Sequence, residues 1–278
     1  MDPIIIIFTT AGCVALLCWI LSLITKDTSW VDRIWSVVPA VYMWIFSAVS
    51  ISEGKASAAL ILTAVLTTLW AARLTFNFAR KGGYTGVEDY RWAILREKMS
   101  PALFQAFNLF FIVIYQNLLL ALIAMPGYIM WKNPTNISGW EILLAACFIA
   151  FLTGETIADQ QQWNFHQSKK AAGGTLSPGF NTTGLFRFSR HPNFFFEQSQ
   201  WWVVYLLGAT SALRAGLGFW GGAINWTIIG ATLLTLLFIG STKFTEWISS
   251  NKYPEYADYK KTTSPMIPMP PRKPSPTK

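Results

Sequence analysis

The stretch from Gly184 to Glu197 brings a dense set of charged side chains to the start of an apolar segment. It reads Gly-Leu-Phe-Arg-Phe-Ser-Arg-His-Pro-Asn-Phe-Phe-Phe-Glu and runs into Trp201 and Trp202. Ser189 suits an N-cap and Pro192 suits a first helical turn, so a helix is expected to begin here. The free N–H groups of a helix N-terminus attract phosphate or carboxylate, and neighbouring arginines add to that attraction. The stretch therefore predicts a cofactor site.

Charges in this stretch also share a helical face. Arg187, Arg190 and Glu197 recur at helical spacing, with Asn193 between them. Glu197 lies inside the apolar segment, where an acid is costly and usually functional. The alternative is that these charges only mark a membrane–water boundary, which is an ordinary place for single arginines.

A pair of carboxylates ends an earlier apolar segment. Glu155 and Asp159 are four residues apart and therefore lie on one helical face. Paired carboxylates suit a metal, but no Glu-x-x-His spacing accompanies them and His166 is isolated. We expect ribose hydroxyls, amides or arginines as their partners, and no metal.

Another polar stripe crosses the apolar segment at 56–78. Trp70, Arg73 and Asn77 recur at helical spacing, and an intramembrane arginine normally faces a bundle interior or a wet cavity. The stripe therefore favours a functional role over a purely structural pairing. Asp32 and Tyr90 stand in polar connections, where Asp32 fits either a substrate-side role or a solvated pair with Arg33, and Tyr90 either a functional loop or a solvated one.

Long apolar runs decide the class of protein. The chain has 278 residues, of which 53% are hydrophobic and only 13% charged, roughly half the charge of a soluble domain. We predict an all-α membrane protein with seven transmembrane helices, at about 3–24, 34–52, 56–78, 103–125, 140–159, 193–213 and 224–246. Eighteen basic residues then lie in the inner loops and tail, against three in the outer loops. This asymmetry places the N-terminus outside, on the lumenal side, and the C-terminus in the cytosol.

Composition also sets the domain organisation. We predict one transmembrane domain over 1–262, with its cofactor-binding part at about 150–262, and a disordered Pro-rich tail over 263–278. The net charge of +8 is spread over the loops, so no nucleic-acid partner is indicated. The three cysteines lie in apolar segments without metal-ligand spacing.

Tyrosines recur every third residue after the last apolar segment. Tyr253, Tyr256 and Tyr259 share a face of a short helix, which suits a lid over a cavity or an anchor at the membrane interface. Lys243 and Glu246 stand at the inner end of the preceding segment.

Three motifs together resemble the steroid 5-alpha-reductase superfamily, and most closely its branch catalogued as a domain of unknown function. They are the Arg-His-Pro-Asn-aromatic motif at 190–194 with Glu197, the Glu-Asp-Tyr-Arg loop at 88–91, and Tyr256 and Tyr259 before Ile267-Pro268. The resemblance runs from about Asp32 to Pro271.

The resemblance implies a seven-helix bundle whose inner cavity holds NADPH. Its members reduce a carbon–carbon double bond conjugated to a carbonyl in a steroid or isoprenoid-type lipid. It implies cofactor contacts at Asp159, Arg187, Arg190, His191, Asn193, Glu197, Glu246, Tyr256 and Tyr259. It implies substrate contacts at Trp70, Arg73 and Asn77. The carbonyl oxygen needs a proton or hydrogen-bond donor, for which Tyr90, Glu155 and Asp32 are the candidates.

Two other functions fit the same motifs. Membrane methyltransferases of isoprenylcysteine or phospholipid amines share the Arg-His-Pro motif, a late acid and the tyrosine tail, and use S-adenosylmethionine. A non-catalytic lipid-binding relative would keep the fold without turnover. The endoplasmic reticulum or another endomembrane suits a lipid enzyme, and a bacterial inner membrane fits the same charge pattern.

Overall fold

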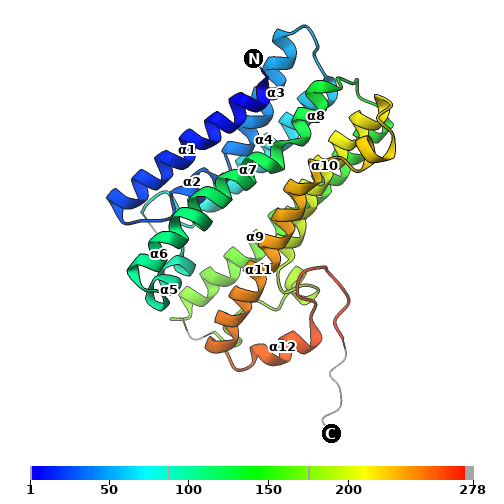
Figure 1. Ribbon diagram of the computed structural model, residues 1–278. Coiled ribbons are helices and arrows are strands. Elements are labelled where there is room, and N and C mark those ends of the chain that lie inside the picture. Colours follow the sequence, from blue (N-terminus) through cyan, green and yellow to red (C-terminus); the bar gives the residue numbers. More distant parts are fainter. Residues whose placement is uncertain (1, 87, 175, 273–278) are drawn as a thin grey trace. The chain divides into compact units, whose positions relative to one another are not determined.

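The computed structural model describes residues 2–86, 88–174 and 176–272, and every regular element in these ranges is a helix (Figure 1). Six helical segments of this part are long and apolar enough to cross a membrane. They are Pro3–Thr25, Trp30–Ser52, Ala58–Arg80, Pro101–Lys132, Gly139–Ala171 and Ile228–Lys252. The prediction of an all-α chain is confirmed for the described residues, and these six helices have the length and apolar composition that a membrane span needs.

Contacts divide the chain into two compact units. Unit 1 comprises Met1–Ala145 and Val203–Thr232, and unit 2 comprises Ala146–Trp202 and Leu233–Lys278. The sequence predicts one domain over 1–262. Helices α9 (Gly139–Ala171), α10 (Pro192–Arg214) and α11 (Ile228–Lys252) contribute residues to both units.

Unit 1 contains the N-terminal helices. In chain order these are α1 (Pro3–Thr25), α2 (Trp30–Trp35), α3 (Val38–Ser52), α4 (Ala58–Arg80), α5 (Tyr90–Lys98), α6 (Pro101–Phe107), the π-helix η1 (Asn108–Tyr115), α7 (Gln116–Ala124) and α8 (Pro126–Lys132). A second π-helix, η3 (Phe219–Ala223), precedes α11.

Helix starts in unit 1 follow capping residues. The Asp2 carboxylate accepts from the Ile4 amide at 3.0 Å, and Ser57 Oγ accepts from the Leu60 amide at 3.3 Å. Each cap satisfies an amide that has no partner within its helix. Pro3 and Pro101 occupy first-turn positions, where the missing N–H costs nothing.

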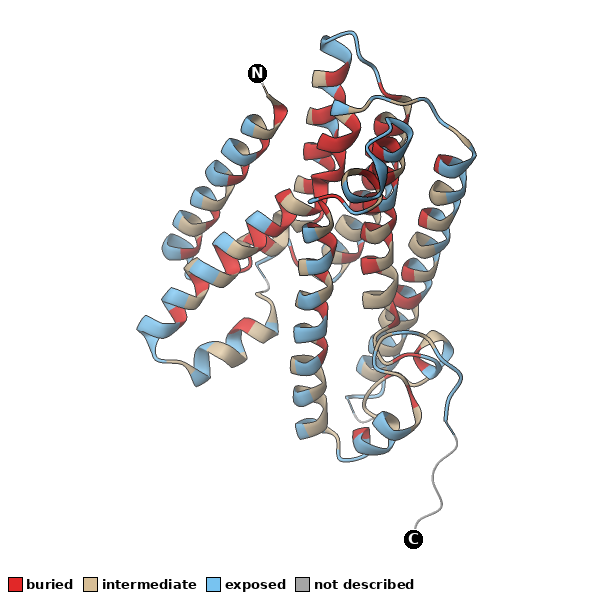
Figure 2. Cartoon of the chain, turned by 45° about the vertical axis from the view of Figure 1, so that its right-hand side comes forward, coloured by how far each residue is buried: buried red, intermediate tan, exposed pale blue. Residues whose placement is uncertain are grey.

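The core of unit 1 is closely packed where small residues meet large ones. A Cβ at Gly127 would lie 2.7 Å from the Phe46 ring, so this contact requires glycine. Tyr42, Phe46 and Trp70 are fully buried. Figure 2 shows buried residues along one side of several helices and exposed residues along the other. The exposed sides of α1 carry Leu and Ile, as expected of surfaces that face lipid.

Unit 2 holds the inner part of α9, the turn η2 (Gly184–Arg187), the start of α10, most of α11 and the short helix α12 (Tyr256–Thr262). A Cβ at Gly154 would lie 2.7 Å from the Phe196 ring, so α9 and α10 approach closely. Residues 263–272, here named the C-terminal strap, follow α12 and make hydrogen bonds with the turn before α10. The rest of the predicted disordered tail, residues 273–278, lies outside the described residues.

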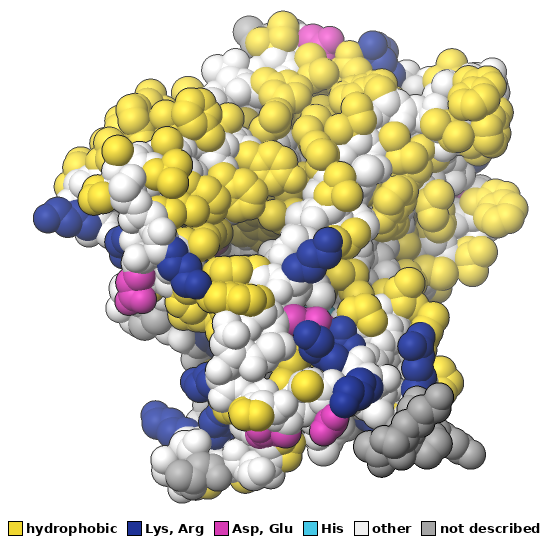
Figure 3. Space-filling model, turned by 60° about the horizontal axis from the view of Figure 1, so that its bottom comes forward, with side chains coloured by type: hydrophobic (Ala, Val, Ile, Leu, Met, Phe, Trp, Pro, Cys, Tyr) yellow, Lys and Arg dark blue, Asp and Glu magenta, His cyan; other side chains and the backbone are white. Residues whose placement is uncertain are grey.

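On the face drawn in Figure 3, the described basic side chains do not form one continuous field. The face in Figure 3 shows Lys and Arg at several separate places among hydrophobic side chains, with a few Asp and Glu beside them. Such a mixture is typical of a protein surface at a membrane boundary, where basic residues accompany apolar ones.

Candidate functional site

The Arg-His-Pro motif of unit 2 lies against an acid at the inner end of α11. Arg190 Nε donates to Glu246 Oε1 at 2.6 Å, and Arg190 Nη2 donates to Oε2 at 3.1 Å. His191 Nε2 lies 3.4 Å from the same Oε1. Only 7% of the Arg190 side chain and 12% of the Glu246 side chain are exposed. Three of the predicted cofactor residues therefore form one cluster.

Buried acids lie on α9 and α10. Glu155, Asp159 and Glu197 are 1%, 4% and 9% exposed. Gln200 Nε2 donates to Glu155 Oε2 at 2.6 Å, and Asn193 is half-buried in the first turn of α10. Three buried acids in a small apolar unit are costly to retain, and such residues in membrane proteins mark substrate or ligand positions. Within the described ranges, no group of three His, Cys, Asp or Glu side chains is arranged to hold a metal ion.

An aromatic cluster surrounds Phe180. Its ring centroid lies 5.7, 4.8 and 5.4 Å from those of Tyr253, Tyr256 and Tyr259. The Tyr259 hydroxyl donates to the Phe186 carbonyl. Burial raises the pKa of both Tyr256 and Tyr259 above the usual value, so both remain phenols at neutral pH. The prediction that all three tyrosines share a face of one short helix is wrong for Tyr253, which precedes α12, although all three rings contact Phe180.

An open pocket of about 420 Å³ lies beside this cluster. Its walls include an aromatic pair, three hydroxyls and one cation: Phe180, Tyr259, Thr182, Thr262, Thr263 and Arg187. Phe180 and Tyr259 are stacked, with an interplanar angle of 29°. Arg187 is exposed, unlike Arg190. The pocket combines a flat apolar wall, which suits a planar heterocycle, with the guanidinium of Arg187 and the carboxylates of Glu255 and Asp258.

Sequence reasoning missed the partner of one lysine. Lys169 Nζ donates to Tyr253 Oη at 2.6 Å and to the Gly179 carbonyl at 2.7 Å. Although burial raises the pKa of Tyr253, the hydrogen bond and charge of Lys169 outweigh it, so the pKa is lower than usual. The three-residue spacing of the tyrosines was the signal for Tyr253. Nothing in the sequence pointed to the Gln161 side chain, which accepts from the Leu185 amide at 2.8 Å.

The remaining predicted residues lie in unit 1. Trp70 is fully buried and Asn77 is 6% exposed, whereas Arg73 is half-buried. Arg80 Nε donates to Asn77 Oδ1 at 2.9 Å, which extends the polar stripe of α4 by one turn. Tyr90 is 56% exposed at the start of α5.

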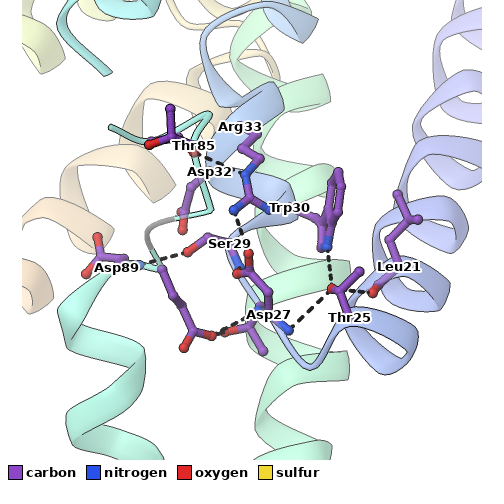
Figure 4. Close-up of polar contacts among 12 residues, drawn as sticks. Leu21, Thr25, Asp27, Ser29, Trp30, Asp32, Arg33, Thr85 and Asp89 are labelled. Carbon is purple, nitrogen blue, oxygen red and sulfur yellow. Dashed lines mark hydrogen bonds and ion pairs between the residues drawn. The ribbon is translucent and has the colours of Figure 1, made fainter. Parts of the chain in front are cut away.

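The Glu-Asp-Tyr-Arg loop joins the connection between α1 and α2 (Figure 4). Glu88 Oε1 accepts from the Thr28 amide at 2.9 Å and from its hydroxyl at 2.7 Å. Arg96 binds the same carboxylate through both terminal nitrogens, at 2.6 and 2.9 Å. These bonds give Glu88 a structural role.

Asp32 and Asp89 belong to the same network. Trp92 Nε1 donates to Asp32 Oδ2 at 3.0 Å, and the Asp89 amide donates to Ser29 Oγ at 3.0 Å. Figure 4 also shows Arg33 paired with Asp27, whose nearest atoms are 2.5 Å apart. The predicted proton donor Asp32 thus lies in a network that fixes the loops of unit 1.

Glu88→Gln should weaken the pH dependence of stability. Burial raises the Glu88 pKa, but the bonds from Arg96 and Thr28 outweigh it and hold the pKa below its usual value. A lowered folded-state pKa contributes stability above the unfolded value of about 4.3 and loses it as the pH falls below that value. Melting temperatures between pH 7 and pH 3.5 should therefore fall less steeply in Glu88→Gln than in the wild type. Asp258→Asn, which removes an exposed pair with Lys261, is the control. Parallel curves for Glu88→Gln and wild type would contradict the prediction.

The sequence profile of the family described as "Protein of unknown function (DUF1295)" matches residues 18–263. The chain belongs to the DUF1295 family. A similar protein is the "Uncharacterized protein C594.04c" of Schizosaccharomyces pombe, which is 39% identical over 257 residues. That alignment covers 87% of this chain and 72% of the yeast protein. No solved structure matches. The DUF1295 match includes the motif at 190–194, the buried acids and all of α12.

Proposed function

We propose that the protein is a membrane-embedded reductase of the steroid 5-alpha-reductase superfamily. It uses NADPH to reduce a carbon–carbon double bond conjugated to a carbonyl in a steroid or isoprenoid-type lipid. The observation that supports this most is the set of buried acids Glu155, Asp159 and Glu197 on α9 and α10. Carboxylates have several acceptor positions, so beside their protein partners these acids could also accept from the ribose hydroxyls and carboxamide of a nicotinamide cofactor.

Each part of the cofactor has residues of matching chemistry in unit 2. Asn193 and Glu197 would take the nicotinamide end, and Asp159 would accept from a ribose hydroxyl. Arg187, exposed at the open pocket, would take a phosphate, and the stacked Phe180 and Tyr259 offer a flat wall for adenine.

The reaction needs a donor at the carbonyl oxygen of the substrate. When bound, NADPH would supply the hydride for the β-carbon, and a protein group or water would supply the proton that completes the saturated product. Glu155, in its protonated form, is the candidate donor that lies among the buried acids. Asp32 and Tyr90 in unit 1 are the other candidates.

The proposal includes a topology of seven spans. Helix α10 joins the six apolar segments as the seventh, because its 23 residues are long enough to cross about 30 Å of hydrocarbon. The charge asymmetry of the loops places the N-terminus outside and the tail in the cytosol. In this proposal Trp70, Arg73 and Asn77 on α4 contact the lipid substrate. The protein lies in an endomembrane such as the endoplasmic reticulum.

A thermal-shift titration tests the proposal. The detergent-purified protein is titrated with NADPH, NADH and S-adenosylmethionine side by side, because a ligand that binds only the folded state raises the melting temperature. A shift with NADPH, larger than that with NADH, is expected. Arg187→Gln should raise the dissociation constant of NADPH by about tenfold, as expected for loss of one charged hydrogen bond. If none of the three ligands raises the melting temperature of the folded protein, the result would favour a non-catalytic lipid-binding protein.

The methyltransferase remains the second candidate on one observation. Arg190, His191 and Glu246, which correspond to the motif and late acid shared with those enzymes, form a single cluster. A melting shift with S-adenosylmethionine and none with NADPH would decide for it.

A further inference from the structure

The C-terminal strap is bonded to the turn before α10 through main-chain atoms. The Arg190 amide donates to the Ser264 carbonyl at 2.8 Å, and the Met269 amide donates to the Phe188 carbonyl at 2.9 Å. Ser189 Oγ donates to the Met266 carbonyl at 2.6 Å. The strap is therefore hydrogen-bonded to three successive residues, 188–190, of the turn before α10.

The strap also closes on itself. The Arg272 amide donates to the Thr262 carbonyl at 2.8 Å, which makes residues 262–272 a closed loop. The Gln198 side-chain Nε2 of α10 donates to the sulfur of Met266 inside this loop. Loops whose ends meet in this way are commonly compact and held by their own contacts.

The Arg190 guanidinium connects this loop to α11. Its Nε and Nη2 bind both oxygens of Glu246, at 2.6 and 3.1 Å. Its Nη1 donates to the carbonyls of Lys260, at 3.2 Å, and Thr263. Four of the five guanidinium N–H groups thus have protein acceptors, one on Nε, two on Nη1 and one on Nη2.

We infer that Arg190 is a positioning residue that clasps the C-terminal strap and the end of α12 to α11, and that it is not the ligand of an anion. The sequence instead assigns Arg190 to cofactor phosphate. Arginine is needed because its planar guanidinium can bind one carboxylate and two carbonyls at once, which the ammonium group of a lysine cannot. The clasp holds Thr262 and Thr263, and these residues form part of the pocket wall. The inference does not depend on which cofactor the pocket binds.

The test measures the strap directly in the full-length protein in nanodiscs, without ligand. Hydrogen exchange is followed in peptides covering 262–272, and trypsin cleavage after Lys260 and Lys261 is timed. Arg190→Gln and Glu246→Gln should each speed exchange of the Met269 and Arg272 amides by about tenfold or more, because the bonds that close the strap then open locally. Peptides from α3, α4 and α7 should keep their protection.

Three further variants separate the clasp from a general loss of structure. Arg190→Lys keeps the charge and should restore part of the protection. The double variant Arg190→Gln, Glu246→Gln should lose no more than the worse single variant, because the two residues act as a pair. Arg187→Gln, in the same motif but exposed, should leave exchange and cleavage at the wild-type rate.

Wild-type exchange of 262–272 in Arg190→Gln would overturn the inference, and so would equal loosening in Arg187→Gln. If Arg190→Gln does not fold, Arg190→Lys decides by the same measurements, and wild-type protection there would again count against the clasp. A loss of NADPH binding in Arg190→Gln with the strap fully protected would instead indicate that Arg190 binds the cofactor phosphate. Failure of NADPH to bind the wild type would affect only the proposed function.

Discussion

Asn193→Ala and Glu197→Ala are each expected to weaken the binding of NADPH, while the helices stay folded. Glu197 is 9% exposed within α10, and Asn193 is half-buried four residues earlier, so the two side chains lie on one face of its first turns. Loss of a hydrogen bond that involves a charged group costs about 1.5–3 kcal/mol, so Glu197→Ala should raise the dissociation constant by roughly tenfold to a hundredfold. Loss of a bond from the neutral Asn193 amide costs about 1 kcal/mol, so Asn193→Ala should raise it by roughly fivefold. Titration calorimetry in detergent gives the affinity, and circular dichroism gives the helix content.

Ser199→Ala is the matched control for this pair. Ser199 lies on the same helix, but its hydroxyl donates only to the Phe195 carbonyl one turn earlier, at 2.7 Å. Such a bond stays within the helix, and its loss should change neither the affinity nor the melting temperature by a measurable amount. Wild-type affinity in both Asn193→Ala and Glu197→Ala would remove the nicotinamide site from α10. Equal loss in Ser199→Ala would show that the effect comes from the helix and not from the site.

Local patterns in the sequence predicted the helices well. Apolar length predicted a span at 3–24, and α1 runs Pro3–Thr25. The Pro192 that suits a first turn is the first residue of α10. These features depend on neighbours within a few residues, through capping, proline geometry and apolar length, so the sequence carries them directly.

Contacts between distant residues were beyond prediction. Glu246 could be recognised as an acid at the end of an apolar segment, but its bond with Arg190 spans 56 positions. Glu88 was one acid in a polar loop until the structure showed Thr28 and Arg96 on its carboxylate. Such pairs depend on how helices pack, and a single sequence contains no record of packing.

The C-terminal strap shows the same limit in another form. Proline-rich composition indicates a segment that cannot bury enough apolar surface to order itself. Residues 263–272 nonetheless have defined partners, because Arg190, Ser189 and Phe188 supply donors and acceptors from elsewhere in the chain. Composition describes what a segment can do alone, and the partners that hold the strap are not part of the segment.

Gly230→Ala should destabilise the protein strongly, whereas Gly240→Ala on the same helix should not. A Cβ at Gly230 would overlap the Leu122 carbonyl and lie 2.8 Å from the Ile123 amide nitrogen. Both are main-chain atoms of α7, so the neighbour cannot move aside as a flexible side chain would, and the overpacking should cost about 3 kcal/mol. No atom lies within 4 Å of a Cβ at Gly240, where alanine gains up to about 1 kcal/mol of helix propensity. Melting temperatures in one detergent compare the two variants directly, and the expected order is Gly240→Ala at or above wild type with Gly230→Ala several degrees below. Equal melting temperatures would mean that α11 and α7 do not approach closely at this point, and that unit 1 packs around a different contact.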